Sequence, residues 1–460
     1  MAIYKWDVVN VLSRRPEMNT FWIWTGHRLI RVSTIDRWYW SPAQGPNPPA
    51  DTPWRVLGQA LWFHNRDQEL WWQHTAPFFN NLLTQCDYQI HEQYRYLCFY
   101  HEHILPVLGP FIRPGIEPDH LSCFTPEGYP FELSVNFQAD RCVLRLGCGP
   151  VGAFAGTEHD PLNKYMAREL LGRLAQLDTS IDLGWFDYFD SQLSLGTKEA
   201  RAASEQLIRH LQQINEVAFD LKDGRVVPKA YFFVQPKSIV TGIPSSVVAF
   251  EAIEGLNADF GTSLSFLKEY LSPSLDGRDT DSPALEVFLI GFDCVAPGKS
   301  RLKLYVCNTH LCLDHLGAFW TLGGRMSDPI TMKGLAIAEK LWSLLGFSDT
   351  LYDEMDVYKL PLTFNYELKS GGSAPKPQLY LPVQGKSDDL VADALTDFFK
   401  YLDWEGYACR YKRELVSNFP CRDLKESVTA QRWVAFSFTE PAGVYLTVYF
   451  HAVGGDVGRF

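Results

Sequence analysis

The chain has 460 residues, of which 46% are hydrophobic and 21% are charged, and these proportions exclude an intrinsically disordered protein. Its 42 Lys and Arg against 54 Asp and Glu give a net charge of −12, so we expect no nucleic acid partner, because phosphates need a basic surface. The sequence contains no apolar run of roughly 18 residues, so we expect no membrane partner either.

The first part of the chain differs from the rest. Trp38-Tyr39-Trp40 leads into a proline-rich stretch over residues 41–53, which suits neither a helix nor a central strand. We therefore expect residues 1–53 to form an N-terminal extension or linker, with packing through its Trp residues as the alternative. Residues 54–460 are expected to form the main domain.

Helical spacing of apolar residues begins after residue 54. Asp67 is a capping residue, and the helix that it opens is predicted to continue through Leu83. A second helix is predicted over residues 90–107, ending near Gly109 and Pro110.

A strand pattern follows, and it repeats. In residues 131–137, Glu132, Ser134 and Asn136 fall on one face and apolar residues on the other, and residues 141–146 complete a hairpin. Comparable strand pairs recur at intervals of roughly 70–85 residues, namely 217–221 with 229–234, 286–293 with 301–306, 362–368 with 376–381, and 433–438 with 444–449. Helical patterns lie between these pairs, over residues 162–177, 198–213, 263–270, 331–345, 388–401 and 408–419.

The repeat predicts an α/β fold in which ten antiparallel strands close into a barrel around a central tunnel, with the helices outside. Closure removes the exposed sheet edges that would otherwise aggregate. The apolar face of each strand then packs on the helices, and the other face points toward the axis.

The inward face combines cations with tyrosines. Its members are Lys229, Tyr231 and Phe233, then Arg301, Lys303 and Tyr305, then Lys376, Gln378 and Tyr380, then Tyr445, Thr447 and Tyr449, with Glu132 and Arg145 from the first hairpin. Lys and Arg from several strands could clamp a diphosphate, and Tyr rings could surround a carbocation. A carboxylate could accept an N–H or a proton. The alternative is a set of ordinary solvated faces of a β-sandwich.

The chain resembles the fungal dimethylallyltryptophan synthase family of aromatic prenyltransferases, which share the αββα prenyltransferase barrel. The segments that carry the resemblance are residues 88–98, 105–110, 130–137, 229–233, 300–305, 320–325, 377–380 and 445–449, in this order and spacing. Residues 365–380 are most similar to members that act on tryptophan-containing cyclic dipeptides. The likeness covers about Trp54 to Tyr449.

The resemblance implies a role for each residue that matches a family motif. Glu132 would accept the indole N–H and is one candidate for the base. The diphosphate would be held by Arg145, Lys229, Arg301 and Lys303, with Gln378 assisting. The dimethylallyl cation would be shielded by Tyr231, Tyr305, Tyr380, Tyr445 and Tyr449.

The family likeness also implies the partners and the setting. The partners would be dimethylallyl diphosphate and an indole acceptor, used by a monomer or homodimer in indole alkaloid biosynthesis, a form of secondary metabolism. The alkylation would be metal-independent and need no cofactor, because Lys and Arg replace the metal. The scattered Cys and the missing signal peptide favour a cytoplasmic location.

Two positions depart from the family pattern. Phe233 stands where many members have the second Tyr of a Lys-x-Tyr-x-Tyr strand, so a ring is kept and a hydroxyl is lost. Trp433 lies in a stretch where some members have Tyr, which leaves its role open.

Three motifs point to other chemistry, and each has a plainer interpretation. Asp388, Asp389 and Asp393 are spaced one residue too far for a DDxxD metal motif and lie at a predicted helix start. Gly147, Gly149 and Gly152 match GxGxxG, but Pro150 and the residues after it do not open the helix that a dinucleotide site needs. A further set, Cys307, His310, Cys312 and His315, fits no common zinc spacing, so we expect no metal site.

Two other functions remain open. One is prenylation of tryptophan, tyrosine or another phenolic acceptor. The other is a barrel without catalytic activity that binds an anionic amphiphile, because such a binder would also need a cationic and aromatic tunnel.

Overall fold

The computed structural model describes residues 20–24, 29–33, 51–113, 120, 122, 124–125, 128–204, 207, 212–275, 285–308, 310–348, 350–351, 360–420 and 422–451. Most of the expected extension, residues 1–53, lies outside these ranges. Within it, β1 (Thr20–Trp24) pairs antiparallel with β2 (Leu29–Ser33).

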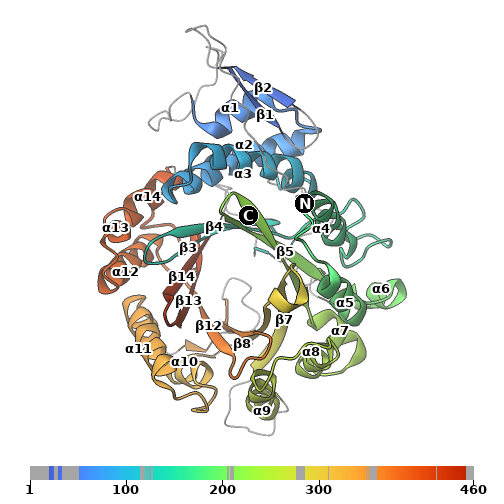
Figure 1. The fold of residues 1–460 in the computed structure, drawn as a ribbon, viewed down its shortest axis with the longest axis vertical. Coiled ribbons are helices and arrows are strands. Elements are labelled where there is room, and N and C mark those ends of the chain that lie inside the picture. The colour runs from blue at the N-terminus through green and yellow to red at the C-terminus, as the bar shows by residue number, and fades with distance from the viewer. Residues whose placement is uncertain are drawn as a thin grey trace.

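Ten antiparallel strands form a closed barrel in the order β11-β12-β13-β14-β3-β4-β5-β6-β7-β8 (Figure 1). The strands are β3 (Phe131–Phe137), β4 (Cys142–Cys148), β5 (Asn215–Lys222), β6 (Arg225–Phe233), β7 (Leu285–Asp293), β8 (Leu302–Asn308), β11 (Leu362–Leu368), β12 (Lys376–Pro382), β13 (Gln431–Thr439) and β14 (Gly443–Phe450). The predicted ten-stranded antiparallel barrel is therefore confirmed.

The barrel closes because strands distant in sequence pair with each other. β14 pairs with β3, with Val448 opposite Val135, and β8 pairs with β11. The remaining two-stranded pair, β9 (His310–Leu311) with β10 (Thr350–Leu351), lies outside the barrel order.

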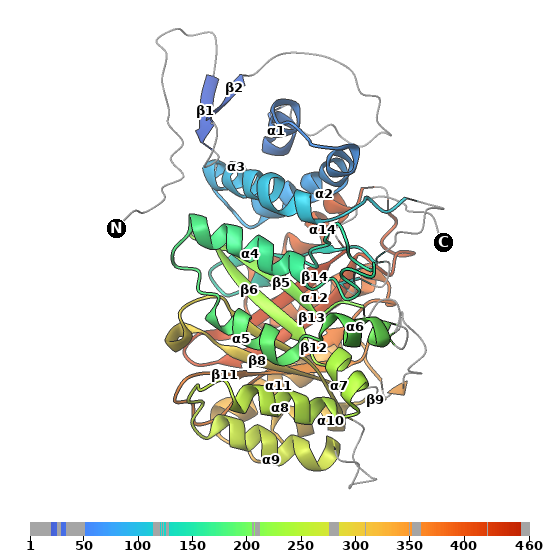
Figure 2. The ribbon, with the colours of Figure 1, turned by 90° about the vertical axis from the view of Figure 1, so that its right-hand side faces the viewer.

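Helices surround the barrel as an outer layer, except that the first of them lies outside the second and third (Figures 1 and 2). They are α1 (Pro53–Ala60), α2 (Arg66–Gln85), α3 (Ile90–Phe99), α4 (Tyr165–Leu177), α5 (Gly184–Leu193), α6 (Thr197–Ser204), α7 (Gln235–Thr241), α8 (Ser245–Glu254), α9 (Ser263–Leu275), α10 (Leu313–Trp320), α11 (Pro329–Leu344), α12 (Asp388–Tyr401), α13 (Glu405–Ala408) and α14 (Tyr411–Asn418). None of the described helices combines the length and the apolar character that crossing a membrane requires.

The core lies between the strands and this helical layer. Aromatic rings from the two layers meet at 5.3 Å between Phe99 and Phe219 and at 5.2 Å between Phe189 and Phe292. Outward residues of the strands, such as Leu133 and Leu146, pack in this core and are fully buried. The period-2 alternation of the sequence thus places its apolar half against the helices and its polar half inside the barrel.

The N-terminal helices differ in detail from the expected ones. The cap of α2 is Asn65, which accepts from the backbone N–H of Gln68 at 2.9 Å, rather than Asp67. The predicted helix over residues 90–107 changes geometry after Phe99, because a π-helical turn (Tyr100–Ile104) and a 3₁₀ turn (Leu105–Val107) follow α3. Pro106 lies in this last turn and cannot donate the N–H that an α-helix needs there.

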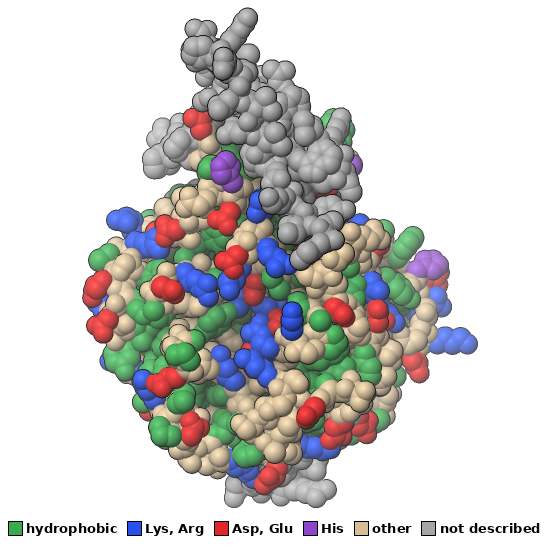
Figure 3. Space-filling model, in the orientation of Figure 1, with side chains coloured by type: hydrophobic (Ala, Val, Ile, Leu, Met, Phe, Trp, Pro, Cys, Tyr) green, Lys and Arg blue, Asp and Glu red, His purple; other side chains and the backbone are tan. Residues whose placement is uncertain are grey.

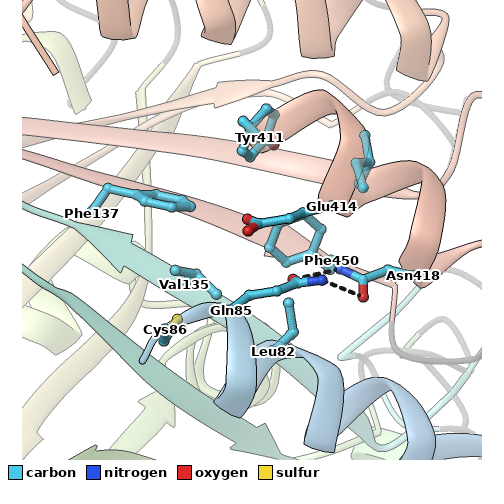
Figure 4. Close-up of a pocket in the computed structure, with 10 residues that line it drawn as sticks. Leu82, Gln85, Cys86, Val135, Phe137, Tyr411, Glu414, Asn418 and Phe450 are labelled. Carbon is cyan, nitrogen blue, oxygen red and sulfur yellow. Dashed lines mark hydrogen bonds between the residues drawn. The ribbon is translucent and has the colours of Figure 1, made fainter. Parts of the chain in front are cut away.

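A small pocket marks where α2 meets α14, the last of the described helices (Figure 4). It lies between α2, α14 and the strands β3 and β14, and its volume is about 330 Å³ with its open mouth included. Gln85 and Asn418 exchange two side-chain hydrogen bonds of 3.0 and 2.9 Å across it. These amides join parts of the chain that are 333 residues apart.

Candidate functional site

The barrel encloses a cavity of about 1270 Å³ with its open mouth included. Viewed down the barrel, Lys and Arg side chains gather at the centre of the face, over this opening (Figure 3). Cations, carboxylates and aromatic rings all line the cavity, and a site built from these groups can bind a charged molecule and a flat one together.

The first cationic group joins β4, β5 and β6. The guanidinium of Arg145 donates from Nε to Oδ1 of Asp220 at 2.7 Å, and Nζ of Lys229 donates to its Oδ2 at 2.5 Å. Arg145 also donates to the hydroxyl of Tyr445, whose ring centroid lies 5.4 Å from the guanidinium carbon. Burial would raise the pKa of Asp220, but Arg145 and Lys229 hold that pKa well below its usual range.

The second cationic group joins β7, β8 and β11, with Arg301 directly before the start of β8. Arg301 forms a two-pronged pair with Asp293, at 2.7 Å from Nε and 3.0 Å from Nη2. Its Nη1 lies 3.3 Å from Oε2 of Glu367, and Nζ of Lys303 lies 3.9 Å from the same oxygen. Burial alone would raise the pKa of Glu367, but the cations around it lower that pKa to about 2.

Lys303 is a buried cation whose pKa is shifted strongly. Burial lowers its pKa to about 7, and the like charges of Arg301 and Lys229 act in the same direction against the attraction of Glu367. Its Nζ donates to Oε1 of Gln378 at 3.1 Å. No described residue accepts from the buried Nε2 of Gln378, which leaves this amide able to donate to an oxygen-rich ligand after a small movement.

Tyrosine rings form a continuous wall next to the cations. The ring centroids lie 6.2 Å apart for Tyr231 and Tyr305, 5.9 Å for Tyr305 and Tyr380, and 6.0 Å for Tyr380 and Tyr449. Burial raises the pKa of all four phenols well above the usual value, so the rings stay neutral. Neutral ring faces of this kind attract a cation and keep water away from it.

Besides the tyrosine wall, the cavity is lined by the carboxylate of Glu132 and the aromatic rings of Phe124 and Trp433. Glu132 is opposite Gly147 in the β3–β4 pair, one diagonal step from Arg145. The ring of Phe124 covers Gly147 so closely that a Cβ built there would lie 2.5 Å from it. Trp433, whose role the sequence leaves open, lines the cavity with its ring 6.4 Å from that of Tyr380.

Most of the site residues predicted from the sequence line the same cavity inside the barrel. Glu132, Arg145, Lys229, Arg301, Lys303, Tyr231, Tyr305, Tyr380 and Tyr449 line the cavity, as does Phe233. Gln378 and Tyr445 are not among the residues that line the cavity, but each accepts a hydrogen bond from a cation that does: Gln378 from Lys303, and Tyr445 from Arg145.

Other residues of the site were not predicted from the sequence. The acidic partners Asp220, Asp293 and Glu367 lie on the first strands of three hairpins, whose inner faces can be identified by continuing the same alternation. Glu216 and Arg432 also line the cavity.

The set of possible metal ligands comes together outside this cavity. The ligand atoms of His310, Cys312 and His315 lie within 4.8 Å of one another, on β9 and the start of α10. Cys307 stays in β8, opposite Thr363 and Glu286. None of these four residues lines the barrel cavity.

Known proteins share this sequence and this fold. The sequence pattern of the family described as tryptophan dimethylallyltransferase matches residues 67–414. The chain is 52% identical to the indole diterpene prenyltransferase anaPT of Neosartorya fischeri over 416 residues, 90% of this chain and 94% of that protein. The crystal structure of AnaPT from that fungus has a TM-score of 0.83 and covers 89% of this chain and 100% of that one. The crystal structure of NotF in complex with brevianamide F and DMSPP is 29% identical, with a TM-score of 0.78 over 88% of this chain and 99% of that one.

Proposed function

The chain belongs to the tryptophan dimethylallyltransferase family, and we propose that it transfers a dimethylallyl group from dimethylallyl diphosphate to the indole of a tryptophan-containing cyclic dipeptide or related indole alkaloid. It is an aromatic prenyltransferase. A similar structure that holds brevianamide F together with DMSPP supports this pair of substrates. The free thiols among the described residues support a cytoplasmic setting.

The observation that carries the proposal is the contact between two kinds of surface within one cavity. Arg145, Lys229, Arg301 and Lys303 would bind the diphosphate, with Gln378 assisting. The wall formed by Tyr231, Tyr305, Tyr380 and Tyr449, with Tyr445 beside Arg145, would enclose the allyl group next to it. An anion clamp alone fits many ligands, whereas a clamp that adjoins a wall of neutral rings fits an anion that leaves a cation behind.

The chemistry follows from these charges. The cations stabilise the negative charge that develops on diphosphate as the donor C–O bond breaks and its electron pair leaves with the phosphate oxygen. The tyrosine faces stabilise the allyl cation and exclude the water that would capture it. The indole, with its N–H on the Glu132 carboxylate, supplies the electron pair of the new bond. A base, for which Glu132 is one candidate, then takes the ring proton and aromaticity is restored. Because side chains neutralise the leaving group, we propose that the reaction needs no divalent metal.

A product assay tests the proposal directly. Pure protein is incubated with dimethylallyl diphosphate and a panel of tryptophan-containing cyclic dipeptides, with and without EDTA, and the products are analysed by mass spectrometry. We expect one added dimethylallyl unit at an equal rate in both conditions. The absence of product from every indole and every phenol tried would contradict the enzymatic proposal, and loss of product with EDTA would contradict its metal independence.

The role of Glu132 has its own test. The change Glu132→Gln keeps the shape of the side chain and removes its charge, so we expect turnover to fall by about 100-fold or more while affinity for the donor is kept. The matched control is Glu158→Gln, because the Glu158 side chain is 68% exposed on the surface. Equal turnover in Glu132→Gln and wild type would contradict the role of Glu132 and would favour a barrel that only binds its ligand.

A further inference from the structure

The cavity contains a buried ion pair whose cation is not among those assigned to diphosphate. Nη1 of Arg432 lies 3.3 Å from Oε1 of Glu132, and both side chains are 8% exposed. The two residues come from β13 and β3, which are separated by β14 in the barrel. Arg432 therefore reaches across a neighbouring strand to contact the carboxylate proposed to hold the acceptor.

A β-bulge makes this reach possible. The register between β13 and β14 shifts between Gln431 and Trp433, so Arg432 is the extra residue of the bulged strand. In a regular strand, two consecutive residues point to opposite faces, yet both Arg432 and Trp433 line the cavity. The bulge thus turns a side chain that would face the helices into the interior.

Arg432 also binds the segment that carries the Phe124 ring, which lies near Glu132. The same Nη1 donates to the backbone carbonyl of Phe124, whose ring lies on Gly147, the residue opposite Glu132. One guanidinium group thus fixes both a carboxylate and the segment that carries the ring beside it. These contacts surround the position that a flat acceptor would occupy.

The pair is poorly explained as a device for stability. A buried ion pair adds little net stability compared with apolar side chains of the same size. In addition, no described residue accepts from the buried Nε of Arg432, and an unpaired buried donor costs free energy. A group kept at such a cost inside a cavity points to function.

We infer that Arg432 is a positioning residue, which keeps Glu132 ionised and aimed at the N–H of the acceptor; this inference rests on the proposed function of Glu132. A protonated carboxyl group would present a donor, whereas a carboxylate can only accept. The neighbouring positive charge favours the carboxylate, and the hydrogen bond to Oε1 fixes its direction. Arg432 itself needs no contact with either substrate.

A double-mutant cycle tests the inference. The variants are Arg432→Gln, Arg432→Lys, Glu132→Gln and the double variant Arg432→Gln/Glu132→Gln, with the exposed Arg173→Gln as the matched control. For each, kcat and KM are measured with the cyclic dipeptide that wild type alkylates fastest. Affinity for dimethylallyl thiolodiphosphate, a donor analogue that resists cleavage, is measured by calorimetry.

We expect Arg432→Gln to lower kcat by roughly 10- to 100-fold, the range of one charge-assisted hydrogen bond, with donor affinity within about twofold of wild type. Arg432→Lys should recover part of the loss, because it restores a positive charge. The double variant should be no slower than Glu132→Gln, because Arg432 acts only through Glu132.

Several results would overturn the inference. These are wild-type turnover in Arg432→Gln, losses that multiply in the double variant, or a parallel loss of donor affinity, which would show that Arg432 supports the barrel as a whole. If Glu132→Gln keeps full turnover, the proposed role of Glu132 fails first and the inference falls with it. The single variants therefore distinguish the two failures.

Discussion

The Oδ2 atom of Asp220 lies 2.5 Å from the Nζ atom of Lys229, so a carboxylate of the protein already pairs with the cations proposed to bind diphosphate. Asp220 bridges the two cations Lys229 and Arg145. Arg301 conversely pairs with two carboxylates, those of Asp293 and Glu367. An incoming diphosphate must compete with these carboxylates for the cations. This competition weakens diphosphate binding, so we expect it to favour release of the product.

We predict that Asp220→Asn destabilises the free protein. The change leaves two buried cations beside each other without their shared partner, which should lower the free energy of unfolding by roughly 3 kcal/mol at neutral pH. Added inorganic diphosphate should then raise the melting temperature of the variant more than that of wild type. Thermal unfolding with and without diphosphate measures both effects, and Asp187→Asn on the surface is the control. Equal diphosphate-induced shifts would contradict the competition.

We predict that donor binding takes up a proton above pH 7. Burial lowers the pKa of Lys303 to about 7, so its side chain is largely neutral at pH 8 and above. The negative donor favours the ammonium form, and affinity should therefore fall as pH rises, by up to about tenfold per pH unit. Calorimetry with dimethylallyl thiolodiphosphate in buffers of different ionisation enthalpy measures the uptake.

The control for this prediction is Lys303→Met, which should bind the donor more weakly at pH 7 and show no uptake from this position. The same pKa also has a consequence for stability. Because the folded protein binds fewer protons than the unfolded chain between about pH 7 and the usual lysine pKa, the contribution of Lys303 to stability increases with pH in that range. If the affinity of the wild-type protein for dimethylallyl thiolodiphosphate does not change with pH, the predicted proton uptake by Lys303 is wrong.

We predict that Tyr305→Leu diverts the reaction toward water. Tyr305 is one of the two inner rings of the wall, next to both Tyr231 and Tyr380. Its loss removes about 0.5–2 kcal/mol of cation stabilisation and opens a path for water. The ratio of dimethylallyl alcohol to prenylated acceptor should rise severalfold, as measured by chromatography. Tyr305→Phe keeps the ring and should keep the ratio, and an unchanged ratio in Tyr305→Leu would contradict the shielding role.

We predict that Gly291→Ala impairs turnover through Tyr231. A Cβ at position 291 would lie 2.7 Å from the Tyr231 ring, so the ring has to move out of the wall. The same methyl group at Gly298 would meet no atom within 4 Å, which makes Gly298→Ala the matched control. We expect kcat to fall by roughly tenfold in the first variant and to stay at the wild-type value in the second. Equal kcat in both variants would show that the wall tolerates displacement.

The fold could be predicted from the sequence because its repeat is long and regular. Each hairpin alternates with period 2, and a one-residue slip would move every cation of the interior into the apolar core. The predicted strand over residues 131–137 coincides with β3 for this reason. Short helices such as α7 and α10 were not predicted, because pieces of one or two turns carry too little periodic pattern.

The cations and rings of the site were predicted from the same alternation, whereas their acidic partners were not, although the alternation continues through the strands that carry them. Asp220 and Glu367 lie on the inner faces of first strands, whereas the inward set was assembled mostly from second strands. The alternation of the strands does not predict that Arg432 faces the interior. Its inward direction depends on a bulge, and alternation from Trp433 assigns it to the outer face.

Because the first barrel strand, β3, pairs with the last, β14, the barrel can close only after nearly all of its sequence has been synthesised. Asn136 on β3 donates to Thr447 on β14, 311 residues later in the chain. A ribosome adding about 5–20 residues per second needs roughly 15–60 s to supply that partner, and until then the growing sheet keeps two open edges. Chains that stop before Gly443 would never lose those edges, and we expect them to aggregate or to be degraded. The compartment that protects a reactive carbocation from water is thus closed only after β14 has been synthesised.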